Sequence, residues 1–396
     1  MATHIGIGFS QEVNTALAAT KAASQAQEQI QQDNIDLVII LSTIHYSPLE
    51  ALLSVRKILN PLRLVGSSAA GIILAELISL RGIAVLAISS DEINFGICAA
   101  TSLDTQDPRE AGNSLARNAI ADLDQPRRQA FIFFIDGLIK NNSPILKSIQ
   151  EVFGNIFPIV GAGSTDDFHF RKTFQYYQDR YLVNSAVGLI LDSATIRVGL
   201  GNKHGWKPLG KPRFITHVEG NIIRTIDHKK ASGLYEEYFG EEAQSLRSAP
   251  MSRLAILYPL GIRLADEHEY LLRNPVSVLH DGSVVCQGEV PEQAQVHLMI
   301  GNKDACRQAA MNAAKEVKEG LGGKTPKLIF IFEDLGRQKL MGRGAFAEVT
   351  LIKQILGYDV PLIGMYCHGT ISPFRTSQSI HRTHLQNENI VVMAIG

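Results

Sequence analysis

Apolar residues along the chain alternate between continuous runs and one-sided helical patterns. The stretches 36–41 (Asp-Leu-Val-Ile-Ile-Leu) and 130–135 (Ala-Phe-Ile-Phe-Phe-Ile) are apolar almost throughout, as expected of strands buried on both faces of a parallel sheet. The segment after Ser47-Pro48 instead has its leucines at helical spacing, and the Ser-Pro pair is typical of a helix start. The pattern therefore predicts an α/β protein.

The same order of elements occurs three times along the chain. Each copy reads as strand, helix, buried strand, helix, a strand that ends in a glycine-containing loop, and a closing strand, a β-α-β-α-β-β unit. The copies span residues 4–88, 93–191 and 295–395. Repetition at this level predicts packed layers with mixed sheets, built from two units in the N-terminal half and one in the C-terminal half.

Two local assignments define the limits of these units. We expect Ser10 to cap a first helix over residues 11–31, and we expect strand 295–300 to open the third copy. Residues 196–294 differ in composition and are predicted to contain hairpins and a short helix. We place the domain boundary near Gly210, so that residues 1–210 hold two repeats and residues 211–396 hold the inserted hairpins and one repeat.

Composition narrows the class of protein. The 396 residues are 45% hydrophobic and 19% charged, with a formal net charge of -1, which favours a soluble protein that binds neither nucleic acid nor membrane. The first residues lack a basic segment followed by an apolar core, so we expect a cytoplasmic location. The four cysteines show no C-x-x-C spacing and the twelve histidines are dispersed, so no disulfide framework or metal site is assigned.

Three glycine loops, each following an apolar strand, are the candidate binding site. A glycine at the end of a strand lets the next backbone amides turn toward a guest molecule. With Arg337, which follows a buried strand and has the fork geometry for a carboxylate, the candidate ligand-binding residues are Gly66, Ser67, Ser68, Gly161, Gly163, Ser164, Thr165, Asp166, Asp167, Tyr366, Cys367, His368 and Thr370.

Each of these features also has a purely structural interpretation. The pair Asp166-Asp167 is suited to a cation, an ammonium group or a shared proton, yet an Asp that binds its own turn is common. Cys367-His368 has the residue types of a nucleophile and a base, but adjacent residues point apart on a strand, so no catalytic residue is assigned. Arg337 equally fits a solvated basic loop. No P-loop or complete dinucleotide fingerprint occurs, only the short Gly6-Ile-Gly8.

Taken together and in order, these motifs resemble those of the FIST family, which comprises bacterial and archaeal sensory proteins with an N-terminal and a C-terminal FIST domain. The resemblance covers nearly the whole chain. It is carried by Gly66-Ser-Ser-Ala-Ala-Gly71, Gly161-Ala-Gly-Ser-Thr-Asp-Asp167, Gly288-Glu-Val-Pro-Glu292, Leu335-Gly-Arg337, Gly364-Met-Tyr-Cys-His-Gly369 and Ser372-Pro373.

The resemblance implies a non-enzymatic sensor of a small ligand, with amino acids proposed, that acts on a separate signalling protein such as a histidine kinase, a cyclase or a chemoreceptor. It implies no fixed cofactor, although some members bind haem and sense nitric oxide, which is the first alternative. An enzyme that uses Cys367 and His368 is the second. The chain departs from the family pattern at Asp334, where a cysteine is frequent, and at Thr370, where a glutamate is usual.

Overall fold

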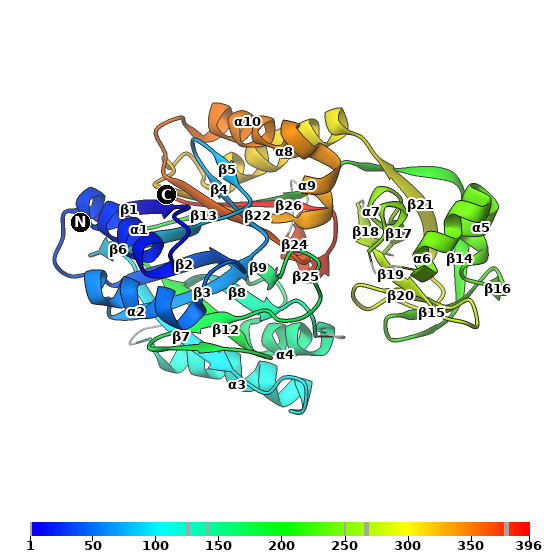
Figure 1. Cartoon of the computed structure of the whole chain (residues 1–396), viewed down its shortest axis with the longest axis horizontal. Helices are drawn as coiled ribbons and strands as arrows, with labels where there is room; N and C mark the ends of the chain where they lie inside the picture. Colours follow the sequence, from blue (N-terminus) through cyan, green and yellow to red (C-terminus); the bar gives the residue numbers. More distant parts are fainter. Residues whose placement is uncertain (1, 124–126, 140–141, 249–250, 265–268, 376–379) are drawn as a thin grey trace.

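Three six-stranded mixed sheets, built to one plan, form the larger lobe of the protein (Figure 1). The computed structural model describes residues 2–123, 127–139, 142–248, 251–264, 269–375 and 380–396. We call residues 2–205 and 302–396 the body, and residues 206–301 the insert. The mixed α/β class and the three repeated units predicted from the sequence are confirmed.

The first two units follow one another along the chain. The first contains β1 (Thr3–Ser10), α1 (Thr15–Ile30), β2 (Leu37–Thr43), α2 (Pro48–Leu59), β3 (Arg63–Ala69), β4 (Gly71–Leu74), β5 (Ile78–Ser79) and β6 (Ile83–Ser90). The second contains β7 (Asn94–Ala100), α3 (Pro108–Ala121), β8 (Arg128–Asp136), α4 (Ser143–Phe153), β9 (Ile159–Ser164), β10 (Gln175–Tyr177), β11 (Arg180–Leu182) and β12 (Ala186–Asp192).

The third unit is split by the insert. It contains β13 (Val198–Lys203), α8 (Lys303–Gly320), β22 (Leu328–Asp334), α9 (Leu335–Met341), the 3-10 turn η2 (Gly342–Gly344), α10 (Phe346–Leu356), β23 (Leu362–Cys367), β24 (Thr370–Arg375), β25 (Ile380–Gln386) and β26 (Ile390–Ile395). The prediction that strand 295–300 opens this unit is wrong, because that strand pairs within the insert and β13 takes the first position beside β26.

Each unit lends a hairpin to a neighbouring sheet. The strand orders are β1-β6-β2-β3-β10-β11, β7-β12-β8-β9-β24-β25 and β13-β26-β22-β23-β4-β5. The hairpin β4-β5 of the first unit therefore joins the sheet of the third unit. The hairpin β10-β11 of the second unit joins the sheet of the first, and the hairpin β24-β25 of the third unit joins the sheet of the second. The pairs β2–β3, β8–β9 and β22–β23 are parallel, and the remaining pairs in these sheets are antiparallel. This cyclic arrangement places one apolar core between the three sheets and one core under the helices of each unit.

Glycines in the first strands allow the helices to pack closely on the sheets. A Cβ added at Gly8 would lie 1.8 Å from the carbonyl oxygen of Ala22 in α1, and one added at Gly201 would lie 1.9 Å from that of Ala313 in α8. The short Gly6-Ile-Gly8 motif is therefore explained by helix packing. The expected cap at Ser10 is wrong as well, because Ser10 ends β1 and Asn14 caps α1 by accepting a hydrogen bond from the Leu17 amide.

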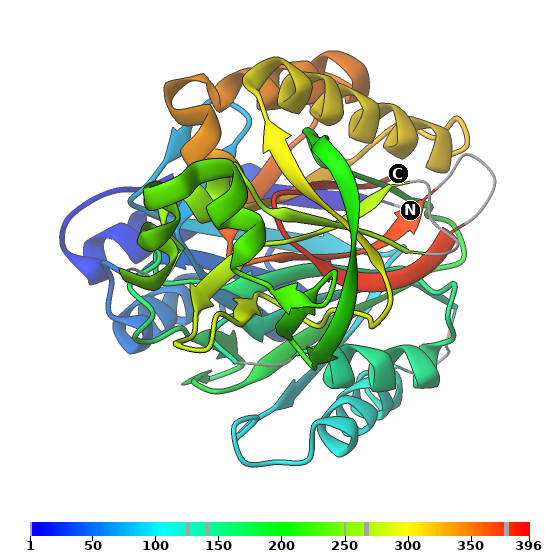
Figure 2. The same cartoon turned by 90° about the vertical axis from the view of Figure 1, so that its right-hand side faces the viewer.

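The insert forms the smaller lobe of the protein and has a hydrophobic core of its own. It contains β14 (Trp206–Glu219), β15 (Ile222–Ile226), β16 (Lys229–Lys230), α5 (Gly233–Phe239), the 3-10 turn η1 (Gly240–Gln244), α6 (Ser245–Ser248), α7 (Arg253–Leu257), β17 (Leu260–Arg263), β18 (Tyr270–Arg273), β19 (Pro275–Val278), β20 (Val284–Cys286) and β21 (Gln295–Gly301). Its sheet has the order β18-β17-β21-β14-β15-β20-β19, and Figure 2 shows the insert in front of the body, with the long β14 crossing it.

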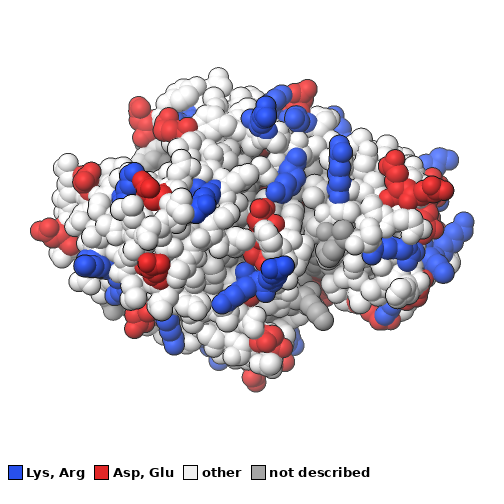
Figure 3. All heavy atoms as spheres, viewed as in Figure 1, with Lys and Arg blue, Asp and Glu red and all other residues white. Residues whose placement is uncertain are grey.

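The chain enters and leaves the insert at adjacent points. Trp206 in β14 pairs with Gly301 in β21, so the two connections to the body lie side by side. On the face drawn in Figure 3, positive and negative side chains are interspersed over both lobes, in keeping with the net charge of -1. The domain division near Gly210 stays a prediction.

Candidate functional site

The prediction that a loop begins at each of the glycines Gly66, Gly161 and Gly364 is wrong, because they lie within β3, β9 and β23. We keep the name glycine loops for the ends of these three strands and the residues that follow them, and they meet where the three sheets of the body converge. The Ser67 and Ser164 hydroxyl oxygens are 2.7 Å apart, which joins the first loop to the second. The Gly163 amide donates to the Gly369 carbonyl, and the His368 amide donates to the Gly163 carbonyl, each at 2.9 Å, which joins the second loop to the third. These amides bind other loops of the same chain, so their local role is to hold the units together.

Most of the predicted ligand-binding residues are buried in this frame. The buried ones are Gly66, Ser67, Ser68, Gly161, Gly163, Ser164, Thr165, Asp166, Arg337, Tyr366, Cys367, His368 and Thr370, whereas Asp167 is half-buried. Asp166 accepts hydrogen bonds from the amides of Phe170, Arg171 and Lys172 and so closes its own turn. Asp167 forms an ion pair with Lys339 at 3.2 Å. Contact between these residues and a ligand stays a prediction.

Arg337 is fully buried and bound by groups of its own unit. Its Nε donates to Glu348 Oε1 at 3.0 Å and its Nη2 donates to the Cys306 carbonyl at 2.6 Å. Glu333 lies 3.6 Å away on the other side. Burial, together with the nearby Glu348 charge, raises the pKa of Glu333 well above its ordinary range. The arginine chosen from the sequence to bind a ligand carboxylate thus binds the Glu348 carboxylate.

Cys367 and His368 point to different surroundings, as adjacent residues on a strand do. The Cys367 thiol donates to the Glu333 carbonyl at 3.3 Å, and burial raises its pKa well above the ordinary value. The His368 ring lies edge-on to Phe168 and Phe170, and burial lowers its pKa to about 4. A thiolate at neutral pH is therefore disfavoured, and the pair has the features of packed residues.

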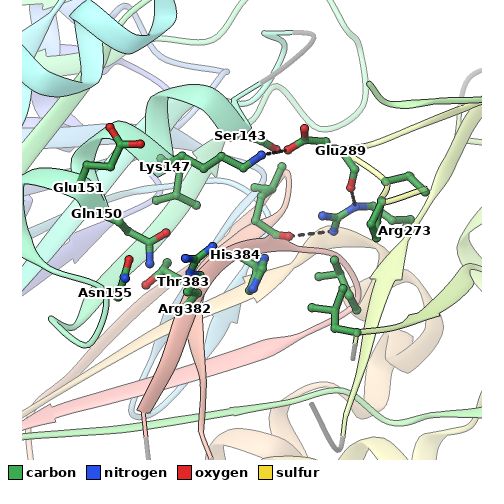
Figure 4. A pocket seen from close by; sticks show the side chains of 16 residues that line it. Ser143, Lys147, Gln150, Glu151, Asn155, Arg273, Glu289, Arg382, Thr383 and His384 are labelled. Carbon is green, nitrogen blue, oxygen red and sulfur yellow. Dashed lines mark hydrogen bonds and ion pairs between the residues drawn. The ribbon is translucent and has the colours of Figure 1, made fainter. Parts of the chain in front are cut away.

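A cleft between the insert and the body was not predicted from the sequence. Its cavity of about 330 Å³ is within the usual size range of small-ligand sites (Figure 4). One wall is α4 and the residues after it, one is β25, and one belongs to the insert. The lining residues are Ser143, Leu146, Lys147, Gln150, Glu151, Asn155, Leu264, Leu271, Arg273, Glu289, Val290, Pro291, Arg382, Thr383, His384 and Leu385.

Polar contacts cross this cleft. Lys147 of α4 forms an ion pair with Glu289 of the insert at 2.7 Å. Arg273 at the end of β18 donates from Nε to the Glu289 carbonyl at 2.9 Å and from Nη1 to the Leu385 carbonyl of β25 at 2.8 Å. Figure 4 shows these contacts spanning the two lobes. Burial lowers the pKa of Arg273 to about 10, which leaves it cationic at neutral pH.

A buried polar network lies next to Arg273 in the chain and connects the insert to the third glycine loop. Asn274 Nδ2 donates to Glu388 Oε1 at 2.8 Å, and the Asn274 amide donates to Asn387 Oδ1 at 3.2 Å. Asp334 accepts from the Gly369 amide at 3.0 Å. Burial raises the pKa of Glu388 well above its ordinary range and that of Asp334 to about 6. The cleft and the loops are thus joined by hydrogen-bonded groups.

The described residues hold no cluster of three or more histidine, cysteine or acidic side chains that suits a metal ion. Every helix in the same part of the chain is too short or too polar to span a lipid bilayer. Sequence reasoning missed Arg273 and the cleft. One signal was available in the sequence, because Arg273 directly follows the apolar residues of Tyr270-Leu-Leu-Arg273. A charged side chain at the end of a buried strand is costly unless it is paired and hydrogen-bonded.

Comparison with known proteins identifies the two parts of the chain. Residues 36–229 match the family model of the FIST N domain, and residues 231–373 match that of the FIST C domain. A curated relative, the uncharacterized protein MJ1623 of Methanocaldococcus jannaschii, is 24% identical over 221 residues. That alignment covers 53% of this chain and 41% of MJ1623, so the matched part is less than half of that relative's length.

Solved structures resemble the chain only remotely. A cyanuric acid hydrolase from A. caulinodans shares 8% identity at a TM-score of 0.41, with 100% of this chain and 99% of that chain covered. PurLQS from Thermotoga maritima shares 11% identity at a TM-score of 0.23, covering 100% and 72%. At these TM-scores neither likeness bears on the function of this chain.

Proposed function

The chain belongs to the FIST family, whose domains are associated with the sensing of small ligands in signal transduction, and from this premise we propose that it binds its ligand in the insert–body cleft. Binding would then be reported as a change in the position of the insert relative to the body. We propose a sensory role without enzymatic activity, and a ligand that is an amino acid or a similar small metabolite.

The observation that carries this proposal is that both lobes line one cavity. Lys147 and His384 come from the body, whereas Arg273 and Glu289 come from the insert. A ligand that contacts both lobes has different affinities for different insert positions, and such a difference is what shifts a conformational equilibrium. The two covalent connections at Trp206 and Gly301 lie side by side, so the chain links the insert to the body at one place about which the insert would turn.

The contacts behind the cleft provide a route from ligand to body. Arg273 donates a hydrogen bond to the Leu385 carbonyl. Leu385 pairs with Ile371 of β24, the strand that directly follows the third glycine loop. Asn274 holds Glu388 in the segment between β25 and β26. A movement of β18 therefore reaches the loop that contains His368 and Thr370.

We further propose that the protein is cytoplasmic and that the signal passes to a separate partner of the histidine kinase, cyclase or chemoreceptor class. Such partners respond to a change in the surface offered to them, which an insert that changes position would supply. Co-purification of the partner should then depend on the compound bound in the cleft. Equal co-purification with and without that compound would count against this route.

A thermal-shift screen of the full chain tests the proposal, since a ligand of the native state raises its stability. The compounds should include amino acids and neutral, cationic and anionic metabolites. We expect at least one to raise the melting temperature, and we expect Asn155→Trp, which fills the cleft, to abolish that rise. Ile156→Trp is the matched control, because Ile156 is 74% exposed and outside the lining.

Two other results would replace this proposal. A compound that still stabilises Asn155→Trp but not Asp167→Ala would place the ligand at the glycine loops. A Soret band in protein purified from haem-supplied cells would favour the haem-based alternative, in which a nitric oxide sensor uses a histidine as an axial ligand. A complete lack of stabilising compounds would contradict the proposal.

A further inference from the structure

We infer that the cleft accepts a small organic monocarboxylate with an apolar body, and that its carboxylate faces Arg273. This inference rests on the proposed function, because it concerns the same cleft, and it adds the chemical class of the ligand. The residues that carry it are the charged and apolar groups of the lining.

Arg273 is a buried cation that has no carboxylate within ion-pair distance among the described residues. Arg273 is 2% exposed. Its guanidinium group donates hydrogen bonds to the backbone carbonyls of Leu272, Glu289 and Leu385. Its Nη2 donates to no group in the described part of the chain. Buried charges in proteins are normally paired with an opposite charge, because removal from water is costly. An anion in the cleft would supply the missing partner.

Arg337 is a buried arginine of the same protein whose charge is balanced by acidic side chains, so it can be compared with Arg273. Arg273 and Arg337 are the two buried arginines among the described residues. Arg337 has the Glu348 carboxylate against Nε and Nη2, with Glu333 nearby. Among the described residues, backbone carbonyls accept the hydrogen bonds of Arg273, and Glu289, whose charge also acts on it, is paired with Lys147. The difference identifies Arg273 as the arginine available to an external carboxylate, for which its fork geometry is suited.

The neighbouring charges add to a positive excess. Among the described lining residues, three are cations, Lys147, Arg273 and Arg382, and two are acids, Glu151 and Glu289. Glu289 is paired with Lys147, and Glu151 is paired outside the lining with Arg109 at 3.0 Å. His384 stays neutral, because burial and the three cations lower its pKa to about 3. The cleft thus favours one negative charge.

Part of the remaining wall is apolar, which provides contacts for a ligand that has an apolar portion. The apolar lining residues are Leu146, Leu264, Leu271, Val290, Pro291 and Leu385. Thr383, which is 3% exposed, adds a hydroxyl with no partner among the described groups. A cavity of about 330 Å³ with these walls suits a compact apolar group that ends in a carboxylate. A strongly hydrated anion such as inorganic phosphate gains little from such walls.

Calorimetry on the full chain tests the chemical class with matched probes. Phenylacetate and 4-methylpentanoate are the carboxylates, their primary amides are uncharged analogues of nearly equal shape, and inorganic phosphate is the hydrated anion. We expect at least one carboxylate to bind with a dissociation constant at least about ten-fold below that of its amide and of phosphate. Equal binding of carboxylate and amide, or no binding of either carboxylate, would overturn the inference.

Substitutions in the cleft should change the affinity for the carboxylate in opposite directions. Glu289→Gln removes a negative charge and releases Lys147, so carboxylate binding should tighten, whereas Lys147→Met and Arg273→Lys should weaken it, the latter about ten-fold. Arg117→Gln, an exposed position on α3, should leave it unchanged. Loss of binding in both Glu289→Gln and Lys147→Met would indicate a structural role for the ion pair and would contradict the inference.

Failure of this inference can be told apart from failure of the proposed function. A neutral or cationic compound that loses its effect in Asn155→Trp would leave the cleft as the sensory site and exclude the carboxylate class. A carboxylate that binds equally to wild type and to Asn155→Trp would contradict both.

Discussion

Asn274 of the insert donates a 2.8 Å hydrogen bond from Nδ2 to Glu388 Oε1 of the body, and both residues are fully buried. Burial, together with the charge of the nearby Asp334, raises the pKa of Glu388. The junction between the lobes therefore contains acidic groups whose protonation is linked to folding. This relationship contributes to the pH dependence of stability.

Asp334 and Glu388 should each contribute a loss of stability as pH rises through the acidic and neutral range. Burial raises the folded-state pKa of Asp334 to about 6 and that of Glu388 well above its ordinary value. Their contribution is present below the unfolded pKa of about 4 and is lost as pH rises through the folded pKa, with a slope of up to about 1.4 kcal/mol per pH unit for each group. Glu388→Gln should flatten this fall, measured by urea unfolding between pH 4 and 8, roughly the window in which these groups titrate.

Glu28→Gln, a change at an exposed carboxylate on α1, is the control and should keep the wild-type slope. A variant Glu388→Gln whose stability falls with pH as steeply as the wild type would contradict the assignment.

The Arg337–Glu348 pair should be costly to break from one side. Glu348→Ala removes the carboxylate that accepts hydrogen bonds from the fully buried Arg337 guanidinium, so we expect a loss of about 3–5 kcal/mol in the free energy of unfolding. The exposed pair of Arg307 and Asp304 is the comparison, and Arg307→Ala should change stability by less than about 1 kcal/mol. Similar losses in the two variants would show that the buried pair is not a structural element.

Glycine positions in the first strands of the units should not tolerate a methyl group. Gly8→Ala and Gly201→Ala would place a Cβ against helix backbone at 1.8 and 1.9 Å, so the helix must move outward at a cost of about 1–3 kcal/mol or more. Gly233→Ala is the control, because no atom lies within 4 Å of its added Cβ. A wild-type melting temperature for both strand variants would refute the close packing.

The cysteines should be slow to react in the native protein. Cys98, Cys286, Cys306 and Cys367 are all buried, and burial raises the pKa of each thiol above its ordinary value. Reaction with a chromogenic disulfide at pH 8 should require unfolding. Rapid modification of Cys367 alone, lost in Cys367→Ser, would instead revive the alternative in which Cys367 is a nucleophile.

The sequence predicted the elements because their signals are local. Pro48 begins α2 as expected, and the buried runs at 37–41 and 130–135 lie in the central strands β2 and β8. Sheet membership is not local. Gly71–Leu74 pairs with residues 363–366 of the third unit, and apolar patterning carries no information about which distant strand a hairpin joins.

The candidate site shows the same limit. The glycine loops have a recognisable local pattern, and the structure brings them together, but their hydrogen bonds to one another depend on the cyclic order of the units. Arg337 looks available in the sequence because its partner Glu348 lies on another helix, eleven residues further on. Arg273 became a candidate only once the insert was placed against β25.

A crystal structure of the full chain with the compound that stabilises it most would test the central claim directly. The account predicts that the compound lies in the insert–body cleft, in contact with Arg273 from the insert and with Lys147 or His384 from the body. A compound bound among Ser67, Ser164 and His368 at the glycine loops, with the cleft unchanged, would contradict it.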